Sequence, residues 1–439
     1  MSYQARLIEA AFVPPTPSAS EAGIPLREMM GRLWDNPLRA LPASAFREPV
    51  VRIRLPGRSL HYVSAPAMVE EVVEDRDGFY APSRLRAALL APLAGADGAF
   101  AEQRLAPLFA PASLVRHSAR LAEYLEQGVR DFGRRELTVD FASLARRIVF
   151  TLLLDLMGGP DLAARRDEIA ALFLPLMQVF DRASRLDLLP LPRFLAPRGA
   201  ARQRAQALVA VLESLTAARA GAAERDGLMA GFLDELPPRD AARSLALVLA
   251  IVCDAAASAL VWTTYLLSLF PAMAERVGEE LRWIDLRDPR LVARTGGLAA
   301  SRVFAESLRL YPPVPLLVFD SLVDHSLGGH EIDRGDKVVV SPWILHRHRR
   351  LWRMPDLFDP RRFEGLGAEP VHPHAWLPFG DGPAAYMAGH AAELFTRLTL
   401  RALLRRFRIA PDDTHGVMPE IRGSLRPRGG LMLRFIPRG

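Results

Sequence analysis

Cysteine is almost absent from this chain of 439 residues, in which Cys253 is the single thiol. One cysteine excludes an intramolecular disulfide framework and every zinc or iron–sulfur site built from several thiolates. So few thiols are typical of a reducing compartment, and we expect a cytoplasmic location. The first residues also lack the continuous apolar stretch of a secretory signal, and Pro14, Pro15 and Pro17 predict an extended leader over residues 1–20.

Lysine is equally scarce, since Lys337 is the only lysine among 56 basic residues. The net charge of +6 does not indicate nucleic-acid binding, because acids alternate with arginines and no basic run is interleaved with aromatic residues. We therefore expect no nucleic-acid partner. A modest positive balance favours the steering of an acidic protein or substrate. The densest basic run, His346 to Arg350, is either such a surface or an ordinary solvated loop.

Only one hydrophobic run is long enough to resemble a membrane span. Ser244 to Phe270 is almost entirely apolar and ends at Pro271. Asp254 near its centre would be costly in lipid, and no second span or flanking anchor accompanies it. These features favour the core helix of a large globular protein, so no membrane span is expected.

Helical periodicity dominates the chain from residue 65 onward. Alternating patterns predict a hairpin of strands 50–55 and 59–63, and two further strands at 316–323 and 337–341. A 3.6-residue repeat predicts helices at 67–75, 114–132, 141–157, 161–180, 200–222, 240–270, 297–310 and 388–407. No linker separates independent units. The prediction is a single domain over residues 1–439, mainly α with a small β lobe.

Three motifs in the last third of the chain have the order and spacing of one enzyme family. Glu306-Ser-Leu-Arg309 ends a helix ahead of two prolines. A second motif runs from Trp352 through Pro355 to Arg362-Phe363, and Phe379-Gly-Asp-Gly382-Pro383 precedes the last long helix. Together they resemble the cytochrome P-450 superfamily. The resemblance implies the P-450 fold, with Glu306, Arg309 and Arg362 joined in one buried charge network.

The resemblance also reaches the haem site. Phe379, Gly380 and Gly382 resemble the start of the haem-binding loop, and Phe100-x-x-x-Arg104 approximates the Trp-x-x-x-Arg of the helix that holds a haem propionate. The central helix, with Asp254, resembles the acid-containing oxygen-activation segment. If haem is bound, Arg104, Phe379, Gly380 and Gly382 would hold it.

The iron ligand of the family is missing. In the loop Phe-Gly-x-Gly-x-Arg-x-Cys-x-Gly the cysteine supplies a thiolate to haem iron. Counting from Phe379 puts Tyr386 at the cysteine and Ala384 at the arginine, and a one-residue slip gives Met387 instead of cysteine. Cys253 cannot substitute, because in the family its helix covers the opposite face of haem. The resemblance therefore predicts no thiolate ligation.

Other changes fall on the positions that touch haem and oxygen in the family. Phe319 stands where the family has an arginine that pairs with a haem propionate, and Ala384 removes the second such arginine. Ala255 replaces the threonine that helps to deliver protons to bound oxygen. Ile251 and Val252 stand where small residues leave clearance. The residues that hold the fold remain while those that serve haem are changed, which indicates a degenerate haem site.

Two other donors near the expected haem loop leave an alternative open. Tyrosinate and imidazole both bind haem iron in proteins. Tyr386 or His390, one helical turn further on, could therefore ligate the iron of an unusual haem protein, although an ordinary packed tyrosine and an ordinary core or surface histidine are the simpler explanation of both residues.

Two further features carry chemistry of their own. Asp254 is a lone carboxylate in an apolar helix, and it is either a catalytic proton relay or the partner of a structural arginine. His372-Pro-His374 puts two imidazoles on one side of an extended segment, but no third metal ligand is visible near them.

Three functions follow from these observations. The first is a haem-free or non-thiolate P-450 homologue that acts as an auxiliary protein in a small-molecule pathway, by analogy with family members that activate glycosyltransferases. The second is a monooxygenase- or peroxidase-like haem protein with Tyr386 or His390 as ligand. The third is a haem-independent enzyme that uses Asp254. The expected partners are a small hydrophobic molecule, a partner enzyme, or an acidic protein at a basic face that includes Arg347, Arg397, Arg401 and Arg405.

Overall fold

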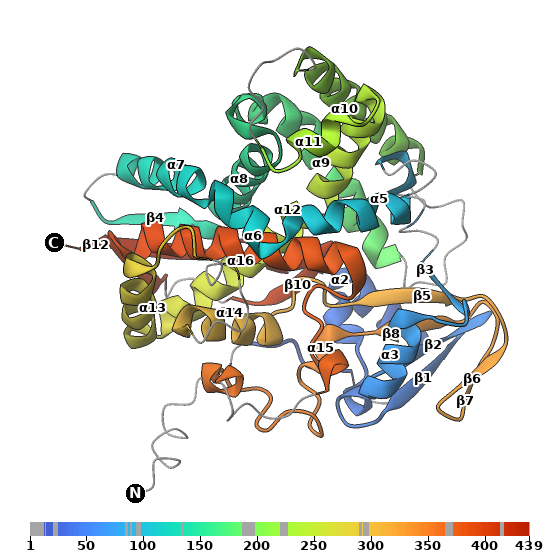
Figure 1. Cartoon of the computed structure of the whole chain (residues 1–439). Helices are drawn as coiled ribbons and strands as arrows, with labels where there is room; N and C mark the ends of the chain where they lie inside the picture. The colour runs from blue at the N-terminus through green and yellow to red at the C-terminus, as the bar shows by residue number, and fades with distance from the viewer. Residues whose placement is uncertain are drawn as a thin grey trace, which may run out of the picture.

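The computed structural model describes the chain except for residues 1–12, 14, 21–24, 84–86, 88–89, 94–97, 133–134, 187–197, 220–226, 289–291, 293–297, 365–371, 413–416 and 439. Most of the leader expected over residues 1–20 lies outside the described residues. Helices make up most of the rest, and a smaller β lobe lies to one side (Figure 1).

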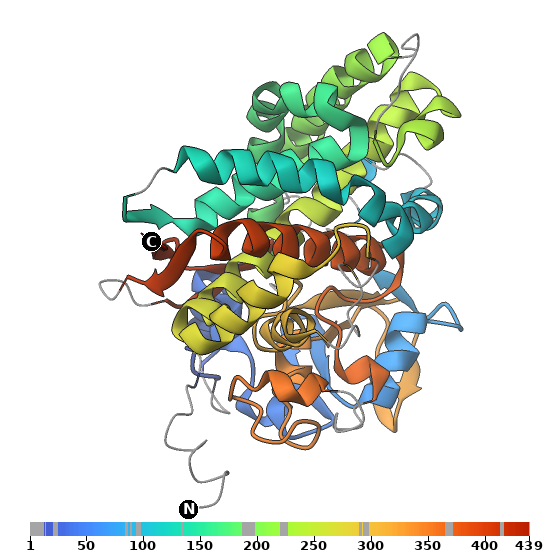
Figure 2. The ribbon, with the colours of Figure 1, turned by 60° about the vertical axis from the view of Figure 1, so that its left-hand side comes forward.

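The helices pack around two long central ones. α12 and α16 lie against each other, with α8, α9 and α10 on one side and α13 and α14 on the other. Figure 2 shows α16 running across the middle of the molecule between these layers. The helices are α2 (Leu26–Asp35), α3 (Pro66–Glu74), α5 (Gly98–Leu105), α6 (Pro111–Leu114), α7 (Ser118–Asp131), α8 (Phe141–Ala164), α9 (Arg166–Leu186), α10 (Arg198–Arg219), α11 (Ala230–Asp234), α12 (Pro238–Leu269), α13 (Pro271–Trp283), α14 (Ala299–Leu310), α15 (Pro342–Leu345) and α16 (Gly382–Leu404).

The apolar run near the middle of the sequence is a buried core helix. Among the described residues, α12 is the one helix long and apolar enough to cross a membrane, and 89% of its most apolar stretch is buried inside the protein. Pro238 stands in its first turn, where no backbone donor is needed, and Pro271 follows its end. α12 is apolar around most of its circumference because helices and strands pack against most of it.

The β lobe is built on one mixed sheet in the order β1-β2-β8-β5-β3. Its β2 and β8 strands pair in parallel, while its other pairs are antiparallel. Three smaller sheets pair β10 with β11, β6 with β7, and β12 with both β4 and β9. The strands are β1 (Val50–Leu55), β2 (Arg58–Val63), β3 (Tyr80–Pro82), β4 (Leu137–Asp140), β5 (Leu317–Ser321), β6 (His325–Leu327), β7 (His330–Ile332), β8 (Lys337–Val340), β9 (Phe407–Pro411), β10 (Pro419–Arg422), β11 (Ser424–Pro427) and β12 (Met432–Pro437).

The predicted architecture, mainly α with a small β lobe, is confirmed. The predictions missed some elements, among them α13 and the β6–β7 hairpin, and several boundaries were inexact. Gly159, with φ of 75°, is not helical and is followed by Pro160, so a kink divides α8 at the gap expected between helices 141–157 and 161–180. The second part of α8 ends at Ala164 and α9 begins at Arg166, where one continuous helix was expected. α16 begins at Gly382, six residues before the predicted start. The low hydrophobicity of Gly382-Pro-Ala-Ala hid this first turn, although Pro383 is well suited to a helix start.

Candidate functional site

A buried charge network ties α14 to the segment that follows Pro355. Glu306 and Arg309, one turn apart on α14, have fully buried side chains, and Nε and Nη2 of Arg309 donate to the Glu306 carboxylate at 2.7 and 2.8 Å. Nε of Arg362 lies 3.4 Å from Oε1 of Glu306. The backbone N–H of Asp359 donates to the same oxygen at 2.8 Å. The structure thus brings together the three residues expected to form one network.

Arg309 also orders the loop beyond α15. It donates to the backbone carbonyls of His346, Pro355 and Leu357 at 2.6–2.9 Å. Both ring nitrogens of the buried His346 are used, because Nδ1 faces the Arg309 carbonyl at 3.1 Å and Nε2 accepts the Leu377 N–H at 2.8 Å. Burial and the nearby Arg309 charge lower the pKa of His346 to about 3, so this ring is neutral.

The segment expected to hold haem leads straight into α16. Gly380 and Gly382 have φ of 86° and 79°, so this turn requires glycine, and a Cβ on Gly380 would lie 3.0 Å from Leu317. Phe379 is buried in the core. Because α16 starts at Gly382, Tyr386 already lies on a helix, with 37% of its surface exposed. Its ring meets the ring of the largely buried His390 edge-on, with 4.3 Å between centroids.

The cations expected around a haem are displaced or absent. Arg104 on α5 stacks over the Phe232 ring at 5.1 Å and lies 3.8 Å from Glu235, so it is engaged with α11 and the residue after it. Phe319 on β5 packs against the apolar core of the β lobe. Ala384 lies in the first turn of α16.

The opposite side of the expected site is lined by α12. Val252 and Ala255 are buried in the main core, and Ile251 packs against it. Cys253, also buried, is a free thiol. Burial and the neighbouring Asp254 raise the pKa of the Cys253 thiol far above its ordinary range, so it stays protonated.

Asp254 is paired with an arginine from a distant strand. Nη2 of Arg426 on β11 donates to its Oδ1 at 2.5 Å, and the Ser424 N–H donates to its Oδ2 at 3.1 Å. Asp181 on α9 lies 3.3 Å from Arg426. Burial lowers the pKa of Arg426, but the Asp254 and Asp181 charges outweigh burial, and the net shift is upward. Of the two interpretations of Asp254, this geometry favours the structural pair.

The Asp254 pair forms the floor of a cleft of about 920 Å³ between α12, α8, α9 and the β10–β11 hairpin. Asp254, Ala257, Ser258 and Val261 present one face of α12 to it. The half-turn at Gly423 closes the hairpin with φ of 71°, and a Cβ there would lie 2.6 Å from Asp181. No local pattern predicts this cleft, because the hairpin and the helix that line it are about 170 residues apart in the chain.

The basic face expected around Arg347 and Arg397 was wrong for these two residues. Arg347 is buried, donates to the Leu310 carbonyl and lies over the Trp343 ring at 3.7 Å. Arg397 is fully buried on α16 and pairs with Glu393. Both arginines serve the core, where a guanidinium can satisfy carbonyls and stack on rings. Arg349 and Arg405 remain exposed, each with a carboxylate within 3.7 Å.

Comparison with known sequences identifies relatives of one family. A sequence model described as Cytochrome P450 matches residues 175–435. "Cytochrome P450 4X1" of Mus musculus is 33% identical over 186 residues, which are 42% of this chain and 36% of that protein. "Thromboxane-A synthase" of Sus scrofa is 29% identical over 182 residues, or 40% of this chain and 34% of that protein. The chain thus spans about a third of the length of these curated relatives.

Solved structures share the fold over nearly the whole chain. The "cytochrome P450DA heme domain" superposes with a TM-score of 0.73 at 19% identity, covering 89% of this chain and 90% of that one. "Retinoic acid bound cyanobacterial CYP120A1" gives a TM-score of 0.75 at 22% identity, covering 97% of this chain and all of that one. At such low identities the likeness concerns the fold.

Proposed function

Because the chain belongs to the cytochrome P450 family, whose members normally bind haem, we propose that it is a member without a thiolate-ligated haem that acts as an auxiliary or partner protein in a small-molecule pathway. The observation that carries the proposal is the phenol of Tyr386 at the position of the ligating cysteine. A thiolate ligand promotes O–O cleavage, and no other side chain supplies the same electron donation.

The other residues around this position also do not fit a thiolate-bound haem. The only thiol, Cys253, is buried on α12 and stays protonated. Arg104 is engaged with Phe232 and Glu235, while Phe319 and Ala384 offer no charge to a propionate. A propionate without a cation would lose the charge-assisted hydrogen bonds that fix it. The Glu306 network, which serves the fold alone, is complete.

One observation favours a second function, a haem protein with another ligand. Tyr386 and His390 stand on the same side of α16 with their rings in contact, so a phenol and an imidazole are available within one helical turn. Either can bind haem iron, as in catalases and globins. By contrast, the pairing of Asp254 with Arg426 speaks against the third function, because a proton relay needs a carboxylate that exchanges its proton readily.

An absorption spectrum of untagged protein from haem-supplemented cells tests the haem site. We expect the reduced protein with carbon monoxide to show no band near ~450 nm, because no thiolate is available. If haem co-purifies through another ligand, Tyr386→Phe and His390→Ala will show which one abolishes its spectrum. A band near ~450 nm in the wild type would overturn the proposal.

Back-substitution tests whether the missing cysteine and arginines are the only reason why haem would not bind. The triple variant Tyr386→Cys, Ala384→Arg and Phe319→Arg restores the ligand and both cations, and Ala384→Arg with Phe319→Arg is its matched control. If the haem cavity is filled, neither variant takes up haem. Stoichiometric uptake by the triple variant alone, with a thiolate spectrum, would instead favour the haem-enzyme function.

A partner surface is available where α16 and α13 end. Trp283, the last residue of α13, has 80% of its surface exposed, and Nη1 of Arg401 faces the neighbouring Ile284 carbonyl at 3.4 Å. Arg405, Arg406 and Arg408 are exposed just beyond Arg401. Exposed tryptophan beside arginine is the composition of energetically dominant interface residues. This surface suits an acidic partner enzyme.

Charge reversal tests this surface. We expect Arg405→Glu with Arg408→Glu to reduce recovery of the partner from the native host in a pull-down, and the loss to be largest at low salt. Arg54→Glu with Arg334→Glu, on the β lobe, makes the same charge change elsewhere and should leave recovery unchanged. Equal recovery of the partner with the wild type and with both double variants would exclude the end of α16 as the docking surface.

A further inference from the structure

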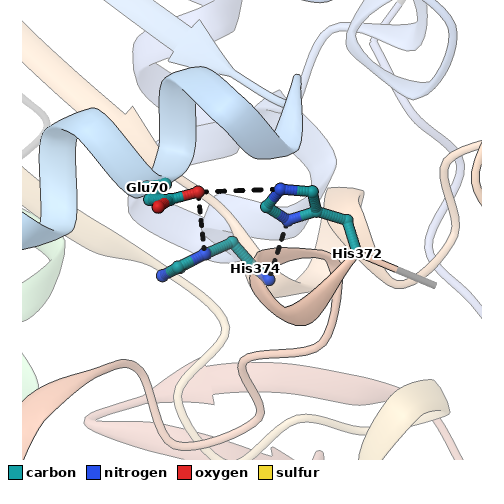
Figure 3. A group of neighbouring side chains, drawn as sticks. All are labelled: Glu70, His372 and His374. Atoms are coloured by element: carbon teal, nitrogen blue, oxygen red, sulfur yellow. Dashed lines mark hydrogen bonds and ion pairs between the residues drawn. The ribbon is translucent and has the colours of Figure 1, made fainter.

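Three side chains that are typical metal ligands converge at the edge of the β lobe. Glu70 belongs to α3, while His372 is the N-cap of a short 3-10 helix, Pro373–Ala375, and His374 is its middle residue. The donor atoms of all three lie within 4.8 Å of one another. Figure 3 shows the Glu70 carboxylate facing both rings. The sequence had shown the two histidines, and the fold supplies the third ligand from 302 residues upstream.

The distances suit a shared ion better than direct contact. Oε2 of Glu70 lies 3.6 Å from Nε2 of His372 and 3.6 Å from Nδ1 of His374. Both distances are too long for good hydrogen bonds, which measure about 2.7–3.2 Å. Two ligands about 2.1 Å from one ion, at a tetrahedral to trigonal angle, stand about 3.4–3.6 Å apart. A single cation would therefore satisfy all three donors with small movements.

Two features of the histidines also indicate a bound ion. Nδ1 of His374 is buried and has no hydrogen-bond partner among the described residues, so a polar atom faces the centre of the cluster unsatisfied. A buried ring nitrogen without a hydrogen bond is available to a cation at the centre of the cluster. Nδ1 of His372 accepts the His374 N–H at 3.2 Å, which holds the ring with Nε2 toward Glu70.

The surroundings favour a cation. A small cavity of about 240 Å³ adjoins Glu70 and is lined by five acidic residues against one arginine, and that arginine is paired with Glu74. The acids are Glu70, Glu71, Glu74, Asp75 and Asp77. A concave surface with an excess of one charge raises the local concentration of the opposite ion.

We propose that Glu70, His372 and His374 bind one divalent transition-metal ion, with Zn²⁺ as the best match. Imidazole and carboxylate are ligands that Zn²⁺ accepts, and two histidines with one glutamate form a known zinc set that leaves a fourth position open. All three side chains are partly exposed, with 38%, 40% and 14% of their surfaces accessible in that order, so water can fill this position. The ion would clamp α3 to the segment that leads to Phe379 and α16.

Binding has a proton cost at His372. With Nδ1 accepting a backbone N–H, the neutral ring carries its proton on Nε2, where the ion would bind. The proton must move to Nδ1, and the ring must release the backbone N–H of His374. Loss of one such hydrogen bond lowers the affinity roughly tenfold relative to a site in which both rings are free to turn.

Zinc titration of untagged, chelator-treated protein tests the site. We expect calorimetry to give one Zn²⁺ per chain, and Glu70→Gln or His374→Asn to weaken binding at least tenfold. Glu331→Gln and His330→Asn, which change an exposed acid and an exposed histidine outside the cluster and the acidic cavity, should bind as the wild type does. Co²⁺ should produce visible absorption bands with the intensity of four-coordinate geometry, and these bands should disappear in the Glu70→Gln protein.

Two outcomes would overturn the proposal. One is the absence of saturable one-to-one binding to the wild-type protein. The other is an equal loss of affinity in the ligand variants and in the two control variants, which would place the ion elsewhere. A melting temperature within one degree of wild type for each metal-free variant would show that lost binding does not come from unfolding.

Discussion

Truncating Glu306 to alanine is the most direct perturbation of this fold. The substitution removes the carboxylate that accepts two hydrogen bonds from Arg309 and one from the Asp359 N–H, and that lies 3.4 Å from Arg362. Arg309 stays fully buried, because three backbone carbonyls still hold its guanidinium. A buried charge has then lost its counter-charge, and water cannot replace it.

The expected cost follows from this geometry. Removing one partner of a buried pair typically costs about 3–5 kcal/mol. At about 2.1 cal/mol/K per residue, a chain of 439 residues has an unfolding entropy of roughly 0.9 kcal/mol/K. The melting temperature should therefore fall by about 3–5 °C if the chain unfolds as one unit, and the soluble yield should fall with it.

Differential scanning calorimetry at a fixed scan rate measures this change. Glu331→Ala, on the exposed strand β7, is the matched control and should melt as the wild type does. Glu306→Gln keeps the shape of the side chain and removes its charge, so it separates the contribution of the charge from that of the side-chain volume. The reasoning is refuted if Glu306→Ala is soluble and melts within one degree of wild type.

Two further perturbations test the buried polar groups. The folded pKa of His346, about 3, lies below its unfolded value of ~6.5, so between these values the unfolded chain binds a proton that the native ring does not. His346 therefore costs no stability above pH 6.5 and lowers the free energy of unfolding as the pH falls, by up to ~1.4 kcal/mol per pH unit. Urea unfolding at pH 6.5 and 5.5 should show a smaller pH dependence for His346→Gln than for the wild type. An equal pH dependence would contradict a neutral, buried His346. Asp254→Asn weakens the pair with Arg426 and should lower the free energy of unfolding by about 1–3 kcal/mol, measured by urea unfolding. A free energy equal to that of the wild type would show that the pair contributes nothing to stability.

Local patterns were enough to predict most of the architecture. Apolar periodicity located α12 and the first hairpin, because such patterns need only neighbouring residues to be interpreted. Glu306 and Arg309 were also expected together, since one helical turn separates them and the motif around Arg362 follows at the family's spacing. Boundaries were less accurate, since the Gly159 kink and the first turn of α16 depend on backbone conformation that apolar periodicity does not report.

The burial of charged residues depended on contacts that the sequence does not contain. The run from His346 to Arg350 looks uniformly basic, yet His346, Arg347 and His348 are buried while Arg349 and Arg350 are exposed. The difference arises because the turn after α15 meets the carbonyls of Arg309 and Leu310, which belong to a distant helix. Composition alone suggested a docking face there, and packing excludes it for Arg347.

Composition and motif spacing are enough to identify the reactive groups of this protein: one thiol, a phenol at the family's ligand position, a carboxylate in the central helix and two histidines two residues apart. Which groups contact one another became clear from the fold. It joined Asp254 to Arg426 over 172 residues and brought Glu70 to His372 and His374 over about 300. The physical reason is that charge pairs and ligand sets act over a few ångströms, and only folding brings residues far apart in the chain within that range.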